Sequence, residues 1–286
     1  MTPQPDSDIT TGDLQALDYA EQALLGGLLL AAGQLEALDD LLPEHFYRPV
    51  HSALFAAMRH LAATHHPALG ERPTKEDEFA WVCDTVAAAV PEAPGLTPSY
   101  AHTLIRNCPT PSHVATYARM VLAGHTRRTV GEHALRVAQA AADRAHPDPV
   151  DATCAQVDQL TAVMGDLARR WRPHPGSLPR ATPPDAPQAP PSEERLDDEL
   201  MLLATAVAHP RTIREIRGLL LPDDFADGLH SAVFASLAGL AHRNDVIDPV
   251  TILWEAQRRR ILTPAGPYTA DQVLQLCQPI GGDPDY

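Results

Sequence analysis

The sequence predicts an all-α protein: two helical-bundle domains joined by a proline-rich linker. Three observations support this. Aromatic residues make up only 5% of the 286 residues, so the cores must consist mainly of Leu, Val and Ala, which favours helices over β-sandwiches. Apolar residues recur at helical steps of three and four along most of the chain. Residues 172–194 contain eight prolines, which is typical of a largely extended linker.

The domain boundaries follow from where helical patterning starts and stops. Residues 1–14 are polar and are expected to form a disordered tail. The first helical domain is expected over 15–146, where Pro147 and Pro149 interrupt the pattern. A linker helix over 147–171 follows, then the proline-rich linker 172–194. A second, shorter helical domain is expected over 195–286.

The first helix is expected over 16–42, because leucines recur through it at helical spacings. Asp18 and Glu21 resemble a capping box at its start. Gly26 and Gly27 lie within it, and each costs about 1 kcal/mol of helix propensity relative to Ala. A close approach of another helix is the usual compensation, so we expect this face to be packed.

The later helices are read from prolines and apolar spacing. Pro43 is expected to open the second helix as its first residue. Pro147 and Pro149 end the last helix of the first domain. The remaining helices of this domain are expected over 79–90, 98–105 and 113–145.

An internal repeat relates the two domains. Residues 42–56 match residues 221–235 without gaps, with eight identities in fifteen positions. Both segments start with Leu-Pro and an acid, which favours a helix start with a carboxylate at its positive end. Phe46 and Phe225 are expected to anchor the two cores. A packing role is favoured over metal binding for the histidines that recur with this motif, His51 and His230.

The helix expected over 150–171 has a narrow apolar stripe, like the seam of a coiled coil. A seam without an obvious partner in the chain suggests docking elsewhere, and the alternative is that it packs back on its own domain. The predicted partner-docking residues are Val157, Leu160, Met164, Leu167 and Trp171.

Enzymatic chemistry finds little support. Lys75 is the only lysine, and no glycine-rich loop precedes it, so the sequence lacks the P-loop that an ATPase of that class needs to hold phosphates. The four cysteines are widely spaced, without a Cys-x-x-Cys pair. Ser52 and Ser231 lack the Gly-x-Ser-x-Gly elbow of a nucleophile. We therefore expect no catalytic residue, no cofactor and no metal.

The net charge of −15 makes the chain a poor default binder of bare nucleic acid. The arginine clusters have two interpretations. They make a weak, salt-sensitive contact with nucleic-acid phosphates, or they form salt bridges with the acidic surface of the chain itself. A further cluster lies at Arg258–Arg260. The possible phosphate contacts are Arg119, Arg127, Arg128 and Arg136.

Several stretches resemble the N-terminal domain of bacterial DnaB-type replicative helicases. Residues 20–30 and 42–55 resemble the beginning of that domain. Residues 111–128 resemble its helical hairpin, and residues 148–164 resemble its linker helix. In the second domain, 245–253 resembles the family's Asp-x-x-Thr segment. The resemblance implies a helical collar domain that forms dimer or trimer contacts and receives primase or loader proteins. In that family an ATPase motor follows, but here a second collar-like copy stands in its place, so helicase activity is not carried over.

The sequence thus predicts a non-enzymatic protein-interaction module of the DNA replication machinery. Its expected partners are a replicative helicase, a primase, a loader protein or copies of itself. Two alternatives stay open: a weak arginine-mediated nucleic-acid-binding accessory protein, and a helicase subunit that relies on an ATPase in another chain. We find neither a signal peptide nor an apolar run of 18 residues, so a cytoplasmic protein without membrane contact is expected.

Overall fold

The computed structural model describes residues 9–143, 147–170, 192–216, 219–263 and 266–278. Every regular element in these ranges is an α-helix or a short 3₁₀ turn, which confirms the all-α prediction. Of the tail expected over 1–14, residues 1–8 lie outside the described residues, whereas 9–14 belong to a helix. Of the linker expected over 172–194, residues 172–191 lie outside the described residues, whereas 193 and 194 begin a helix. Within the described ranges, no helix has the length and apolarity needed to cross a membrane.

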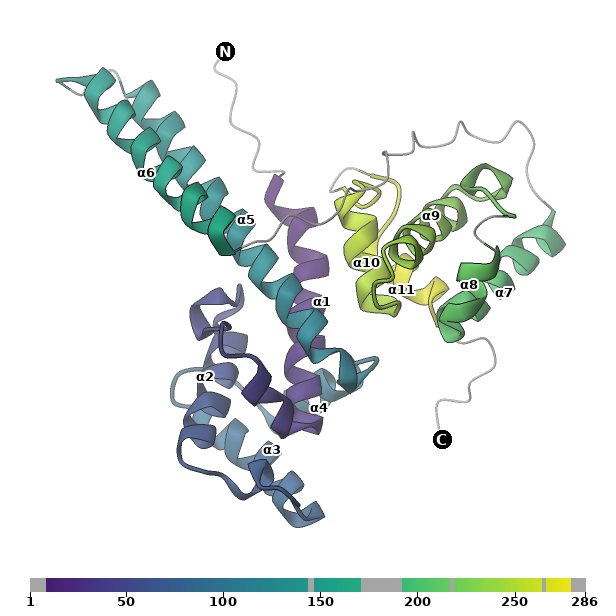
Figure 1. The fold of residues 1–286 in the computed structure, drawn as a ribbon, viewed down its shortest axis with the longest axis horizontal. Helices are drawn as coiled ribbons and strands as arrows, with labels where there is room; N and C mark the ends of the chain where they lie inside the picture. Colours follow the sequence, from purple (N-terminus) through teal and green to yellow (C-terminus); the bar gives the residue numbers. More distant parts are fainter. Residues whose placement is uncertain (1–8, 144–146, 171–191, 217–218, 264–265, 279–286) are drawn as a thin grey trace. The chain divides into compact units, whose positions relative to one another are not determined.

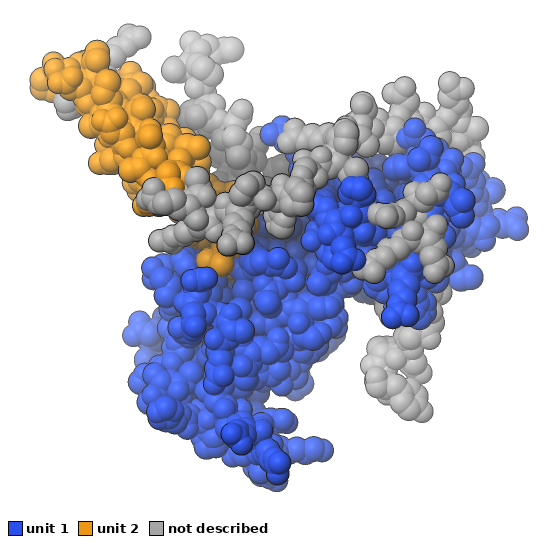
Figure 2. Space-filling model, viewed as in Figure 1, with its two compact units in different colours: residues 1–120, 179–286 blue, residues 121–178 orange. Residues whose placement is uncertain are grey.

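The contacts divide the chain into two compact units (Figure 2). One consists of residues 1–120 together with 179–286, and the other of residues 121–178. Both members of the internal repeat lie in the first of these units. We call residues 15–120 the first copy and residues 192–278 the second copy. The boundary at residue 120 falls within one long helix, earlier than the domain end inferred from Pro147 and Pro149.

The first copy is a small helical bundle (Figure 1). Helix α1 lies at its centre and packs against α2, α3 and α4. The expected helix over 98–105 is confirmed, and the one expected over 79–90 begins earlier, because Thr74 and Asp77 cap it reciprocally. The helices are α1 (Ile9–Leu30), α2 (Pro49–Ala63), α3 (Lys75–Ala89), α4 (Pro98–Arg106) and the start of α5 (Val114–Ala142).

Two expected helix starts were wrong. Helix α1 already begins at Ile9, so Asp18 and Glu21 lie in its interior and cannot cap its N-terminus. Pro43 opens a 3₁₀ turn that ends at His45, and α2 begins only at Pro49. The reason is that Pro49 supplies a second first-turn proline, and the turn before it lets Phe46 reach the core.

The close approach expected at the glycine pair is confirmed. A Cβ atom on Gly26 would lie 2.0 Å from the backbone oxygen of Leu104 in α4, and one on Gly27 would lie 2.5 Å from Cγ2 of Val114. Real Cβ atoms do not approach other heavy atoms so closely. Glycine is therefore required at both positions for α1 to contact α4 and the beginning of α5.

The second copy is also a small helical bundle, but its central helix is α9, the counterpart of α2, and not α7, the counterpart of α1. Its central helix α9 packs against α7, α8 and α10 (Figure 1). The 3₁₀ turn Pro222–Asp224 precedes α9 as Pro43–His45 precedes α2. The helices are α7 (Glu193–Ala208), α8 (Pro210–Ile216), α9 (Gly228–His242), α10 (Pro249–Arg258) and α11 (Ala270–Leu276).

The repeated Phe pairs lie in both cores. The rings of Phe46 and Phe55 are 5.1 Å apart, and those of Phe225 and Phe234 are 4.8 Å apart. Phe46 is buried, as expected of an anchor, whereas Phe225 is only half-buried. The first Phe of the repeated pair is therefore more exposed to solvent in the second copy than in the first.

The other unit is a helical hairpin. It consists of the later part of α5 and of α6 (Pro149–Arg170), which confirms the two long helices expected there. Residues of both helices line one shallow hollow, among them Gln139 on α5 and Gln156 on α6, so the helices run side by side at this point (Figure 1).

Candidate functional site

A buried carboxylate organises the first copy. Glu21 on α1 accepts hydrogen bonds from the backbone N–H of Tyr47 (2.5 Å) and of Arg48 (3.3 Å). Its Oε2 also lies 2.7 Å from Nδ1 of His51, whose Nε2 lies 2.7 Å from the hydroxyl of Tyr100. Because Glu21 and His51 are fully buried, this network fixes where α2 starts relative to α1.

The second copy contains the same device. Glu199 accepts hydrogen bonds from the backbone N–H of Ala226 (2.6 Å) and of Asp227 (3.4 Å), and lies 2.9 Å from Nδ1 of His230. Burial alone would raise the pKa of Glu199, but the bonds from Ala226, His230 and Asp227 outweigh it and lower that pKa below its ordinary value. The carboxylate is therefore held in its charged form.

The sequence pattern revealed the two histidines of these networks but not the two glutamates. His51 and His230 recur at the offset of the repeat, and the packing role expected of them is confirmed by these bonds. Glu21 and Glu199 are 178 positions apart, one fewer than the histidines. The ungapped comparison therefore did not align them, and Glu21 was assigned to a helix cap. Aligning the preceding helices with a one-residue gap would have found the pair.

A carboxylate also joins the two copies. Asp248 begins α10 and accepts the backbone N–H of Thr251 with its Oδ1 (2.9 Å). Its Oδ2 lies 2.7 Å from Nδ1 of His113 and accepts a hydrogen bond from the hydroxyl of Tyr117 (2.8 Å). Tyr117 is fully buried, and burial together with the charge of Asp248 raises the pKa of that phenol. We call His113, Tyr117 and Asp248 the carboxylate clasp.

A second polar contact lies along the same boundary, where α1 packs against α10. The hydroxyl of Tyr19 on α1 donates a hydrogen bond to Asp271 on α11 (2.9 Å), and burial and this carboxylate raise the pKa of Tyr19 to about 12. A hollow of about 350 Å³ lies beside it, lined by Asn107 of the first copy and Thr269 of the second among others. The boundary between the copies is thus polar and incompletely packed at this edge.

The predicted docking stripe lies on the hairpin. Val157 and Met164 are exposed, with 43% and 53% of their surface accessible, and Val150 on the same row is 68% exposed. Leu160 and Leu167 are half-buried. Trp171 lies outside the described residues. The row Val150, Val157 and Met164 has a spacing of seven, which keeps these side chains near one face of α6.

The predicted phosphate contacts lie along α5 but differ in their partners. Arg119 is exposed and donates to the hydroxyl of Thr116 (3.2 Å). Arg136 lies 4.0 Å from Glu132, one helical turn earlier. Arg127 is exposed and Arg128 is half-buried on the same helix.

The last arginine cluster favours the salt-bridge interpretation. Glu255 on α10 is buried, and Arg243 lies 2.9 Å from it. Arg259 also lies 2.9 Å from Glu255, and Arg258 lies 3.5 Å from it. Two members of the triplet at Arg258–Arg260 therefore neutralise a carboxylate of their own helix.

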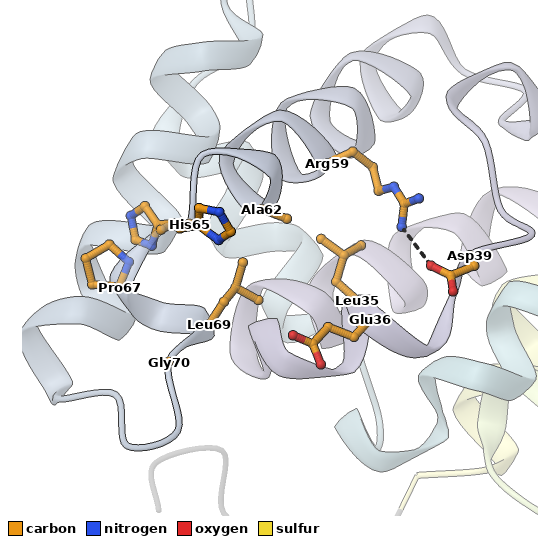
Figure 3. Close-up of a pocket in the computed structure, with 10 residues that line it drawn as sticks. Leu35, Glu36, Asp39, Arg59, Ala62, His65, Pro67, Leu69 and Gly70 are labelled. Atoms are coloured by element: carbon orange, nitrogen blue, oxygen red, sulfur yellow. Dashed lines mark ion pairs between the residues drawn. The ribbon is translucent and has the colours of Figure 1, made fainter.

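An open hollow of about 490 Å³ lies beside the C-terminal end of α2 (Figure 3). Arg59 points across it to Asp39, 3.8 Å away. His65 lies at its rim with a φ of 57°, in the left-handed conformation that ends α2, and Asn244 ends α9 in the same way. Within the residues that the structure describes, no three His, Cys, Asp or Glu side chains gather as metal ligands. Charged and apolar side chains together form the walls of the hollow.

The fold and its contacts define a class of protein, in which two all-α repeat domains occur together with a helical hairpin. Its prominent features are hydrogen-bond networks between packed helices. The sequence model of the family described as DnaB-like helicase N terminal domain matches residues 14–68 and 191–277. Two segments of the chain are therefore similar to the domain that this family model describes. The second match covers the second copy up to residue 277, and the first match ends within the first copy, at residue 68.

A solved structure resembles part of the chain. The crystal structure of the N-terminal domain of DnaB helicase from Mycobacterium tuberculosis is 28% identical over 52% of this chain and 95% of that chain, with a TM-score of 0.40.

Proposed function

We propose that this chain is a non-enzymatic interaction module of the DNA replication machinery, which binds a replicative helicase, a primase or a loader through the hairpin. The family match supports a helicase-associated role. The observation that carries the proposal is the exposed apolar row on α6, Val150, Val157 and Met164.

The row is suited to helix–helix docking. Side chains spaced by seven drift by only about 20° per step around a helix, so they present a nearly straight seam. Single exposed apolar residues are common on soluble proteins, but three on one seam of a 22-residue helix favour a partner helix. The flanking Asp151 and Asp158 are exposed and suit a polar rim around such a contact.

The direct test is binding to the purified replicative helicase, and separately the primase and loader, of the host. Val157→Asp with Met164→Asp should weaken binding at least tenfold in calorimetry. Because both side chains are exposed, the fold should persist, as a helical circular dichroism spectrum would verify. Gln159→Asp, an exposed change on another face of α6, is the matched control. Equal affinity of the wild type and the double variant would contradict the docking role.

We also propose that the chain hydrolyses no ATP by itself, since its only lysine lacks the glycine-rich loop of a P-loop. Phosphate release from Mg-ATP by the purified chain, with and without DNA, measures this. Release above that of a buffer blank, co-eluting with the protein, would favour the helicase-subunit alternative.

A further inference from the structure

We propose that the outer face of α3 in the first copy binds a basic amphipathic helix of another protein. This face is an apolar stripe with an acidic border, and we call Phe79, Cys83, Ala87 and Val90 the α3 stripe. It lies on a different element from the row on α6, so the inference goes beyond the proposed function.

The α3 stripe is apolar and open to solvent. Its members follow one another at steps of four, four and three, which places them along one side of a helix. Phe79 is 73% exposed and Val90 is 42% exposed, and Cys83 and Ala87 between them are exposed as well. A phenylalanine so exposed, with further apolar side chains in line, is typical of a binding surface.

The other side of α3 is firmly held in the first copy. Trp81 is fully buried, and its indole N–H donates a hydrogen bond to the backbone oxygen of Leu28 on α1 (3.0 Å). Thr85 and Ala89, which follow at helical spacing, are buried as well. The stripe therefore belongs to a helix that is fixed in place before a partner binds, which lowers the entropic cost of binding.

The internal repeat shows what covers the equivalent position in the second copy. Thr74 and Asp248 cap α3 and α10 in the same way. Counted from these caps, Phe79 corresponds to Leu253, which is fully buried. Besides α9 and α11 of its own copy, α10 packs against α1 of the first copy. The counterpart of α3 is therefore covered by a helix from outside its own copy.

For α3 itself, the described part of the chain supplies no such cover. Its main packing partners are α1, α2, α4 and the 3₁₀ turn Pro67–Leu69, and all of them belong to the first copy. Because α1 is already engaged with α10 within each chain, a second copy of this chain does not offer the helix that would repeat the contact. The occupant that fits is a helix of a different protein.

The charge beside the stripe defines the occupant further. Helix α3 carries four acids and one lysine. Asp77 is used to cap the helix, but Glu76 and Glu78 are exposed. Successive residues rotate by about 100° around a helix, so these two carboxylates border Phe79 on opposite sides. Lysine or arginine side chains beside the apolar residues of the partner would meet them in the rim of the contact.

A synthetic peptide serves as the probe for the full-length chain. It has the length of α3 and consists of leucine, alanine and lysine, with leucines at steps of four, four and three and lysines beside them. A second peptide carries glutamate in place of each lysine. Calorimetry should show that the wild type binds the lysine peptide more tightly than the glutamate peptide.

Two exposed cysteines report where the peptide binds. Cys83 belongs to the α3 stripe, whereas Cys154 lies on α6 and is the internal control. The bound lysine peptide should slow the alkylation of Cys83 by iodoacetamide and leave that of Cys154 unchanged, as mass spectrometry of the digested protein would measure.

Three variants separate the contributions. Phe79→Ser should weaken binding of the lysine peptide about tenfold, because a few central side chains carry most of the energy of such contacts. Glu76→Lys with Glu78→Lys should reverse the preference between the peptides. All three side chains are exposed, so circular dichroism should show an intact fold. Val157→Asp with Met164→Asp on α6 should leave peptide binding unchanged, which keeps this inference distinct from the proposed function.

Lysines at a helix N-terminus oppose the helix dipole. If they lower the helix content, Glu76→Gln with Glu78→Gln takes their place and should abolish the preference for the lysine peptide.

The proposal is overturned if the wild type binds neither peptide or both equally, if Phe79→Ser keeps the full affinity, or if the peptide protects Cys83 no more than Cys154. It is also overturned if light scattering shows a wild-type dimer that Phe79→Ser converts into a monomer, because the occupant would then be a second copy of this chain.

Discussion

The contact of α1 with α4 depends on the absence of one methyl group, so Gly26→Ala should destabilise the protein although alanine favours helices. The added Cβ would lie 2.0 Å from the oxygen and 2.7 Å from the carbon of the Leu104 carbonyl. Both are backbone atoms of α4 and cannot rotate away. The helix would have to retreat by about 1 Å, the difference between 2.0 Å and the 3.0 Å below which Cβ contacts essentially never occur.

Two opposing terms set the size of the effect. Replacing Gly by Ala within a helix gains about 1 kcal/mol of propensity. Forcing an extra carbon into a packed interior costs about 1–3 kcal/mol, and more where the backbone must move. We expect the packing term to win, with a net loss of about 2 kcal/mol of the free energy of unfolding. For a chain of this size that corresponds to a melting temperature lower by about 4–8 °C.

The assay is thermal and urea unfolding followed by circular dichroism, with Gly33→Ala as the matched control. Gly33 is exposed in the same unit, and a Cβ atom there would meet nothing within 4 Å. Its replacement should be neutral or stabilise by about 0.4–1 kcal/mol, through a less flexible unfolded chain. If Gly26→Ala stabilised the protein as much as Gly33→Ala, the close helix contact would be wrong.

Three further outcomes are expected. The pKa of Glu199 is lowered in the folded state. The stability that this carboxylate contributes is therefore present above its unfolded pKa of about 4.3 and is lost as the pH falls through the folded value. Glu199→Gln should flatten the acid limb of a stability–pH curve, and an unchanged limb would contradict this. Phe46→Ala should cost about 3–5 kcal/mol, and Phe225→Ala should cost less because Phe225 is half-buried; equal losses in urea unfolding would show that exposure does not decide the difference. Limited proteolysis should cut within 172–194 and leave two helical fragments, unless the second copy depends on the first, in which case its fragment would be digested at once.

The fold was largely predictable from local signals, because helix formation depends on spacings, prolines and glycines that the sequence displays. Gly26 and Gly27 even predicted a close helix contact, which the structure shows against Leu104 and Val114. Helix starts were less predictable. Asp18 and Glu21 satisfy a capping pattern, yet Glu21 is needed inside the helix to bind backbone N–H groups from a segment 26 positions away.

The contact between the copies could not be read from sequence for a related reason. Asp248 and Thr251 have the pattern of an ordinary helix cap, and that is one of their functions. Nothing in the pattern shows that the second carboxylate oxygen faces His113 and Tyr117. Long-range polar contacts between separately patterned domains depend on how the domains pack, and periodicity within each domain carries no information about it.

The two copies are not interchangeable at this contact, and the reason lies in how each starts its corresponding helix. In the first copy Thr74 occupies the cap position of α3 and Asp77 lies three residues later, where its Oδ2 accepts the backbone N–H of Thr74 (2.8 Å). In the second copy the order is reversed, with the acid, Asp248, at the cap of α10. Both arrangements satisfy a helix N-terminus equally well.

Only the second arrangement leaves a cap carboxylate with an oxygen to spare for another domain. The first copy can therefore act as receptor through His113 and Tyr117, but it cannot act as ligand in the same way, and the contact has a direction. Directional contacts close into rings or grow into open filaments when every unit carries both faces. Here each chain carries one receptor and one ligand on separate copies. In the structure the receptor and the ligand of one chain meet each other, so the contact is closed within that chain.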